Sequence, residues 1–248
     1  MNDDVRNIVL GLVATAISAS LGWLARTGLW RRRLRRERAF FGLPEHAESL
    51  LVVNRDPAAT EPAVHRYDVF ALLELSALIK ECGAHAEVAT QDTVRQGFGE
   101  RTEFCVGGPA SNRRTAAHLS AMLPGLRITT DPEPVAERGT FRIGGEVYRM
   151  ERGVSEYVLL ARVTTGGRAR PVFLFCGQRA ITNQAATRYL ARHHERLARR
   201  YGDGTFVLLL KVLNSQAYGP DVVELVADVT RAARTPLPEP EPEPASSA

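Results

Sequence analysis

An uncharged, mostly apolar stretch of eighteen residues, from Ile8 to Ala25, constrains this chain more than any other feature. An α-helix rises about 1.5 Å per residue, so eighteen residues extend about 27 Å, close to the thickness of the hydrocarbon core of a bilayer. We therefore expect a single N-terminal transmembrane helix, and assign residues 1–30 to a membrane anchor.

The charges on either side of this stretch predict its orientation. Asp3, Asp4 and Arg6 precede it, whereas the segment from Arg26 to Arg38 holds seven Arg and one Glu. Positive charge beside a membrane helix stays in the cytoplasm. We expect a single-pass signal-anchor protein of the cell membrane, with its N-terminus outside and its main domain cytoplasmic. A cleaved signal peptide is the main alternative, but it requires the opposite order of charge. A buried helix of a soluble protein is a third possibility.

The same region predicts two partners. The arginines of the segment 31–38 are placed to contact anionic lipid headgroups. Small residues recur on one face of the expected helix, which permits close packing of two copies and a homodimer, although such residues are common in membrane helices. They are Gly11, Ala14, Ser18 and Gly22.

Nucleic acid is not an expected partner, despite a pI of about 9.2. The segment from Arg26 to Arg38 contributes a charge of +6, so the rest of a chain whose net charge is +4 sums to −2. The basic character is therefore local. Three cysteines without metal-ligand spacing fit a reducing compartment and predict neither disulfides nor a metal site. The sequence identifies no cofactor.

Short apolar runs alternate with helical patterns along the rest of the chain. We expect strands at 50–54, 85–89, 103–106, 126–129, 157–163, 172–176 and 206–212, and helices at 67–82, 111–123 and 180–201. A hairpin is expected at 140–150, turning at Gly144-Gly145, and Pro220 is expected to open a last helix with Val222, Leu225, Val226 and Val229 on its buried face.

This order predicts a three-layer α/β domain at 50–235, with a mainly parallel, Rossmann-like sheet and an antiparallel hairpin insertion. Residues 31–49 form a basic juxtamembrane collar and connector. Residues 236–248 alternate Pro and Glu before a short Ala/Ser end, and we expect a disordered tail there.

Two stretches of the domain resemble each other. The segments 104–112 and 173–183 each hold an apolar strand, a glycine turn and a Ser/Thr–Asn pair that leads into a helix. Such turns bind anions through free backbone amides and the helix dipole. The candidate ligand-binding residues are Gly107, Gly108, Ser111, Asn112, Gly177, Gln178, Thr182 and Asn183. Both helix starts are expected to converge on one anion, with the amides of Asn112 and Asn183. Ordinary turn and capping chemistry explains the same residues.

The leading hypothesis is therefore a regulatory, membrane-anchored cytosolic module that binds a nucleotide or another phosphorylated small molecule. One alternative is a hydrolase acting on a nucleotide or glycosyl substrate, with Glu100 or Glu103 as acid or base, or Cys105 or Cys176 as nucleophile. A membrane scaffold without a ligand is another.

The overall pattern resembles single-pass membrane proteins of actinomycetes: a short N-terminus, one apolar helix, an arginine collar and an α/β domain. Lys80 and Lys211 are the two lysines among 32 Lys and Arg residues, a bias that fits a high-GC bacterium. The resemblance implies a bacterial protein with its α/β domain in the cytosol. It implies no activity, since none is established for that group.

Overall fold

The computed structural model describes residues 2–54, 60, 63–94, 96–131, 133, 134, 137–167 and 169–237. The side chains of residues 2–6, 9, 11 and 14 lie outside this description, as does the predicted tail from residue 238 onward. The helices are α1 (Asn2–Phe41), α2 (Arg66–Glu81), α3 (Arg113–Met122), α4 (Ala180–Tyr201), α5 (Ser215–Tyr218) and α6 (Thr230–Arg234). The strands are β1 (Glu48–Val53), β2 (His85–Thr90), β3 (Thr102–Val106), β4 (Leu126–Ile128), β5 (Phe141–Ile143), β6 (Glu146–Tyr148), β7 (Ser155–Val163), β8 (Val172–Gly177), β9 (Phe206–Leu213) and β10 (Val223–Asp228).

A seven-stranded mixed sheet in the order β10-β9-β7-β8-β3-β1-β2 forms the centre of the domain. Strands β8, β3, β1 and β2 pair in parallel, whereas β7 is antiparallel to both β8 and β9, and β10 is antiparallel to β9. Five strands therefore run in one direction and two in the other. This arrangement confirms the α/β class and the mainly parallel sheet.

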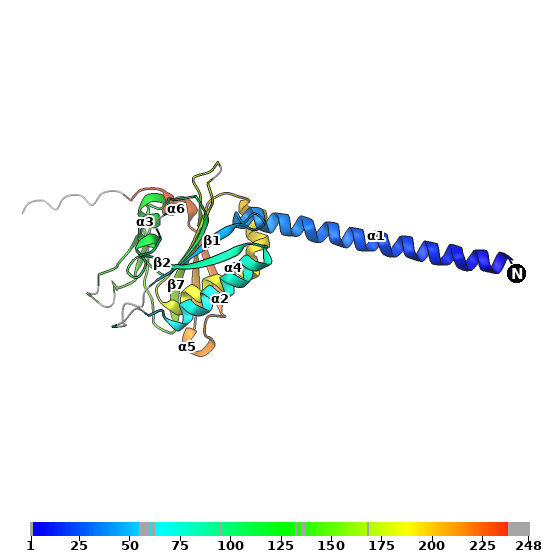
Figure 1. The fold of residues 1–248 in the computed structure, drawn as a ribbon. Coiled ribbons are helices and arrows are strands. Elements are labelled where there is room, and N and C mark those ends of the chain that lie inside the picture. The colour runs from blue at the N-terminus through cyan, green and yellow to red at the C-terminus, as the bar shows by residue number, and fades with distance from the viewer. Residues whose placement is uncertain are drawn as a thin grey trace, which may run out of the picture.

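Layers of other elements cover both faces of the sheet. Helices α2 and α4 lie on one face, and α3, α6 and a small antiparallel sheet, β4-β5-β6, lie on the other (Figure 1). Burial of both faces explains why the central strands are continuous apolar runs rather than alternating ones. All five residues of β3 are buried, for example. The small sheet contains the predicted hairpin, in which Gly144 has a φ of +61°.

The last turn of α1 is part of the core, and the rest of the helix projects away from the domain (Figure 1). The rings of Phe40 and Phe41 are buried, and Phe40 stacks on Phe206 with ring centroids 6.1 Å apart. The buried guanidinium of Arg162 donates to the carbonyl oxygen of Phe40 at 2.9 Å. Burial lowers the pKa of Arg162 to about 10. These contacts fix the end of α1 to the sheet.

The predicted membrane segment, Ile8 to Ala25, lies inside α1. Among the residues covered by the description, no helix is both long enough and apolar enough to cross a membrane. Two of the small residues of the predicted dimer face, Gly11 and Ala14, fall outside the described side chains.

The predicted last helix is wrong, because the chain forms strand β10 there. Burial alternates along β10, with Val223, Leu225 and Ala227 half-buried and their neighbours exposed. Strand β10 pairs with β9 and places Val223 opposite Val212. Apolar residues occur in this segment at both helical and alternating spacing, and pairing with the otherwise open edge of β9 selects the strand.

Candidate functional site

The two repeated glycine turns lie side by side. Strands β3 and β8 are parallel neighbours, with Val106 opposite Phe175, so both strands end at the same edge of the sheet. A Cβ atom placed on Gly108 would lie 3.5 Å from the carbonyl oxygen of Gly177. The prediction that both turns open at one edge is therefore confirmed.

The helices that follow these turns depart to opposite faces of the sheet. Helix α3, after β3, covers the face that carries the small sheet, and α4, after β8, covers the face that carries α2. Adjacent parallel strands whose helices diverge leave a crevice at their carboxyl ends, where α/β proteins bind ligands.

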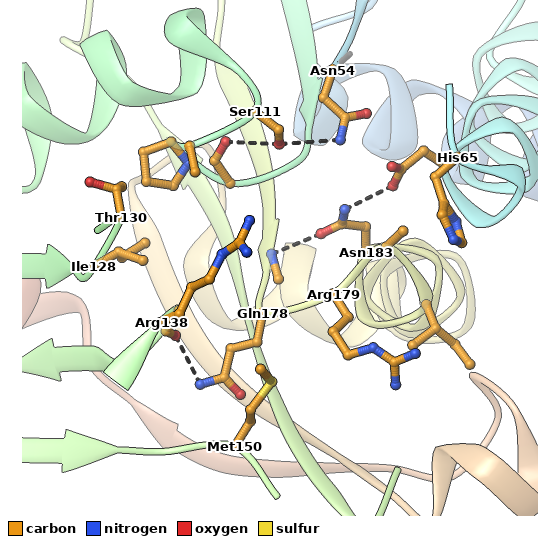
Figure 2. A pocket seen from close by; sticks show the side chains of 18 of the residues that line it. Asn54, His65, Ser111, Ile128, Thr130, Arg138, Met150, Gln178, Arg179 and Asn183 are labelled. Carbon is orange, nitrogen blue, oxygen red and sulfur yellow. Dashed lines mark hydrogen bonds between the residues drawn. The ribbon is translucent and has the colours of Figure 1, made fainter. Parts of the chain in front are cut away.

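A cavity of about 410 Å³ occupies this crevice (Figure 2). Its volume is within the range of small-molecule sites. The lining residues are Asn54, His65, Tyr67, Asp68, Gly108, Pro109, Ala110, Ser111, Ile128, Thr129, Thr130, Arg138, Gly139, Met150, Arg152, Gly177, Gln178, Arg179, Ala180, Ile181 and Asn183.

Five of the eight predicted site residues line this cavity, and three do not. Gly108, Ser111, Gly177, Gln178 and Asn183 are in its wall. Gly107, Asn112 and Thr182 are not among its lining residues. Whether any of the eight residues contacts a ligand stays a prediction.

The start of α3 is closed, contrary to the expectation that both helix starts face one anion. The side chain of Asn112 is buried, and its Oδ1 accepts from the backbone amides of Arg114 and Thr115. Its Nδ2 donates to the carbonyl oxygen of Val106 at 3.0 Å. The backbone amide of Arg113 donates to the side chain of Gln91. Asn112 is a helix cap with every polar atom in use.

The start of α4 is open. Thr182 is buried and donates to the carbonyl oxygen of Arg179 at 2.7 Å, so it acts as a local cap. The backbone amides of Ala180 and Ile181, by contrast, have no acceptor among the described residues. Both residues line the cavity. A 22-residue helix thus presents two free amides and the positive end of its dipole to this space.

Asn183 holds the floor of the cavity together. Its Oδ1 accepts from the amide of Gly177 at 2.8 Å, and its Nδ2 donates to Oδ1 of buried Asp68 at 2.8 Å (Figure 2). These bonds join the end of β8 to the first turns of α2 and α4. The side-chain amide of Asn183 is therefore engaged and not free for an anion.

Gln178 joins the main sheet to the small one. Its Oε1 accepts from the amide of Tyr157, and its Nε2 donates to the carbonyl oxygens of Gly139 and Tyr148. The side chain of Gln178 is thus a structural link in the cavity wall.

Asn54, directly after β1, lines the cavity and has a buried oxygen with unused hydrogen-bonding capacity among the described residues. It is 6% exposed, and its Nδ2 donates to the Oγ of Ser111 at 3.2 Å. Its Oδ1 is buried and has no donor within the described part of the chain. A buried carbonyl oxygen without a donor costs free energy, so a ligand N–H or O–H that reached it would stabilise the protein.

Among the described residues, three arginines line the cavity, and no local sequence pattern marks them as site residues. Arg138 and Arg152 come from loops beside the small sheet, and Arg179 precedes α4. Figure 2 shows the guanidinium of Arg138 turned into the cavity, and it has no acceptor among the described residues. Asp68 is the one carboxylate among the described lining residues.

Of the two carboxylates proposed as acid or base for the hydrolase alternative, Glu103 is unsuited to that role. Glu103 is fully buried in β3, where Arg114 donates to both of its oxygens at 2.5 and 2.7 Å and His118 lies 3.1 Å away. Burial alone would raise the pKa of Glu103, but the hydrogen bonds from Arg114 and His118 hold it at about 2. Glu103 is therefore an ionised structural carboxylate, outside the cavity. Glu100 accepts from the backbone amide of Gly97, also outside it.

The cysteines are equally unsuited to nucleophilic chemistry. Burial raises the pKa of Cys105 well above its usual range and that of Cys176 to about 12. Both thiols are fully buried and stay protonated at neutral pH.

Within the described part of the chain, two groups of side chains have atoms close enough to hold a metal ion: Glu103, Cys105 and His118, and Glu37, His194 and Glu195. In each group an arginine side chain already forms ion pairs with the carboxylates. Arg114 pairs with Glu103, and Arg33 pairs with Glu37 at 3.0 Å and with Glu195 at 2.7 Å. A metal ion would have to displace these cations, so neither group fits a metal site.

Together, the fold and the cavity define an α/β protein with a ligand-sized site at a topological switch point. No known protein family matches the chain, and a search of curated proteins finds no significant relative. The resemblance to actinomycete membrane proteins stays a prediction.

Proposed function

We propose that this chain is a membrane-anchored regulatory module whose cytosolic domain binds a nucleotide or another phosphorylated small molecule in the cavity at the carboxyl ends of β1, β3 and β8. The observation that carries the proposal is that the open start of α4 and the guanidinium of Arg138, which has no partner in the described part of the chain, line the same cavity. Free amides and arginine are the groups that proteins use to bind phosphate.

The remaining wall suits the uncharged part of such a ligand. Ile128, Met150 and Ile181 supply apolar surface, and Asn54 supplies a buried acceptor without a described donor. Apolar surface beside hydrogen-bonding groups is typical of a site for an organic molecule rather than for a free ion. The ligand we propose therefore has a phosphate and an organic body with at least one N–H or O–H group.

Membrane attachment is the second part of the proposal. Its support is the uncharged segment Ile8 to Ala25, the arginine collar that follows, and the exposed apolar side chains of α1, among them Leu12 and Trp23 at 67% each. The collar arginines would contact anionic headgroups and keep the domain in the cytosol.

A homodimer through α1 belongs to the same proposal. A Cβ atom on Gly22 would meet nothing within 4 Å in this chain, so Gly22→Ile is compatible with the folded monomer. It should reduce crosslinking between full-length copies if the small residues form the helix–helix contact. Unchanged crosslinking would remove Gly22 from any interface.

The ligand proposal is tested by calorimetric titration of the full-length chain with phosphorylated metabolites, in wild type and in Arg138→Gln. Charge-assisted hydrogen bonds are each worth about 1.5–3 kcal/mol, so the substitution should weaken binding roughly tenfold to a hundredfold. Arg127→Gln is the matched control, because Arg127 is exposed on β4 of the same small sheet and does not line the cavity. Equal loss in both variants, or no binding in wild type, would reject the proposal.

The hydrolase alternative is separated from binding by turnover. A bound ligand recovered intact after long incubation supports a regulatory module, whereas release of phosphate or of a sugar at a rate that depends on the protein supports an enzyme. The burial of Glu103 leaves Glu100 as the one carboxylate that the sequence suggested as acid or base, and Glu100 does not line the cavity.

A further inference from the structure

A second cavity, of about 470 Å³, adjoins the first one. The two share the wall residues His65, Tyr67, Arg152, Arg179 and Ile181. We call the cavity at the start of α4 the first lobe and the adjoining one the second lobe. Because they share these residues, the lobes are two parts of one cleft, which is longer than the first lobe alone.

The second lobe is strongly basic. Arg66, Arg152 and Arg179 line it, and no carboxylate does so among its described residues. The chain outside the segment from Arg26 to Arg38 has a net charge of −2, so this clustering is not a general property of the domain. A local excess of arginine in a concave site favours an anionic ligand.

Arg179 is held between the lobes by a buried carboxylate. Its Nη1 lies 2.5 Å from Oε1 of Glu156, which is fully buried in β7. Glu156 in turn accepts from the amide of Gly153 at 2.9 Å and from the Oγ of Ser215 at 2.8 Å. The side chain of Arg179 is 32% exposed, so part of its guanidinium still faces the cleft. An arginine oriented in this way loses little freedom on binding an anion.

Two rings line both lobes. His65 and Tyr67 are stacked, with centroids 5.6 Å apart and an angle of 19° between the rings. The guanidinium carbon of Arg66 lies 4.9 Å from the centroid of Tyr67. Flat aromatic and guanidinium groups of this kind stack on nucleobases.

The geometry points to a ligand that spans both lobes, a nucleotide carrying two phosphate groups. One phosphate lies at the start of α4 with Arg138, and the other lies in the second lobe with Arg66 and Arg152. Arg179 lies between them and contacts both. This inference rests on the proposed function, since it names the ligand class of the same site.

The test compares AMP, which has one phosphate, with ADP and adenosine 3′,5′-bisphosphate, which have two, by calorimetric titration of the full-length chain. At least one of the two-phosphate nucleotides should bind about tenfold more tightly than AMP. Arg66→Gln should reduce that advantage, because it should weaken binding of the two-phosphate nucleotide more than it weakens binding of AMP. Arg231→Gln is the control, because Arg231 is exposed on α6 and lies outside both lobes.

The possible failures are distinguishable. If AMP binds and neither second phosphate improves affinity, the two-lobe assignment is wrong while the proposed function stands. If Arg66→Gln weakens binding of AMP as much as binding of ADP, the assignment is also wrong, because Arg66 would then not contact the second phosphate specifically. If none of the three nucleotides binds to wild type, the proposed function itself fails for adenine nucleotides.

Discussion

Gly177 has no room for a side chain, and Gly108 beside it does. A Cβ atom on Gly177 would lie 2.1 Å from the Oγ1 of Thr182 and 2.7 Å from the Oδ1 of Asn183, whereas on Gly108 the nearest atoms are 3.5 and 3.7 Å away. Neither glycine has a positive φ, so both backbones accept alanine and the difference between the two sites is steric.

Gly177→Ala should therefore be strongly destabilising. Overpacking a filled site costs about 1–3 kcal/mol. The methyl group also displaces Asn183 from the amide of Gly177, a hydrogen bond worth about 0.5–1.5 kcal/mol. The sum is about 3 kcal/mol, which lowers the melting temperature of a domain of this size by roughly 6–12 °C. Gly108→Ala makes ordinary van der Waals contacts and should change stability by no more than about 0.5 kcal/mol.

The assay is thermal unfolding of both variants and wild type, followed by circular dichroism at neutral pH. The reasoning is refuted if Gly177→Ala has the same melting temperature as wild type, or if Gly108→Ala loses as much stability as Gly177→Ala. The first result would mean that the end of β8 relaxes without cost and that the tight packing described for the start of α4 is wrong. The second would mean that the room around each glycine does not determine the cost of a methyl group there.

Three further predictions address other parts of the account. Since the pKa of Glu103 in the folded state is lowered from 4.5 to about 2, its contribution of about 3 kcal/mol is present above pH 4.5 and is lost as the pH falls toward 2. Glu103→Gln should thus destabilise the chain in urea at pH 7 and much less near pH 2; a constant difference would contradict the ion pairs. Cys176, with a pKa of about 12, should react with iodoacetamide at pH 8 no faster than the protein unfolds, and rapid labelling of the native chain would disprove its burial. A reporter enzyme that is active only outside the cytoplasm should be inactive when it is fused after Thr235. An active fusion would mean that the domain lies on the other side of the membrane from the one proposed.

The arrangement of the two turns was predictable because it depends on local pattern and on strand direction. An apolar strand, a glycine and a Ser/Thr–Asn pair identify a strand-to-helix turn, and parallel neighbours bring two such turns to one edge. Which turn stays open was not predictable. Asn112 caps two amides of α3, but the amide of Arg113 is closed by Gln91, 21 residues before Asn112 in the chain, and no local pattern near Asn112 indicates that contact.

The basic residues of the cleft were missed for a related reason. Arg66, Arg138 and Arg152 lie in separate parts of the chain and are brought together only by the packing of α2 and the small sheet against the main sheet. The sequence offers Glu103 as a candidate acid or base, and its structural role was not predictable because its partners, Arg114 and His118, are on α3 and pair with it only after that helix packs on the sheet.

The last helix was misjudged because two periodicities coexist in one apolar segment. Val222, Leu225 and Val226 fit a helical face, but Val223, Leu225 and Ala227 also fit a strand. The free edge of β9 decided between them, and an edge is a property of the assembled sheet rather than of the local sequence.

The most direct test of the central claim is a nitrogen–proton correlation spectrum of the labelled full-length chain during titration with inorganic pyrophosphate. The account predicts saturable shifts of the amide signals of Ala180 and Ile181 with one common midpoint, weakened in Arg138→Gln. The amides of Arg114 and Thr115 at the closed start of α3 should not follow that midpoint. If Ala180 and Ile181 show no saturable shift, the start of α4 is not a phosphate site and the proposed function is wrong.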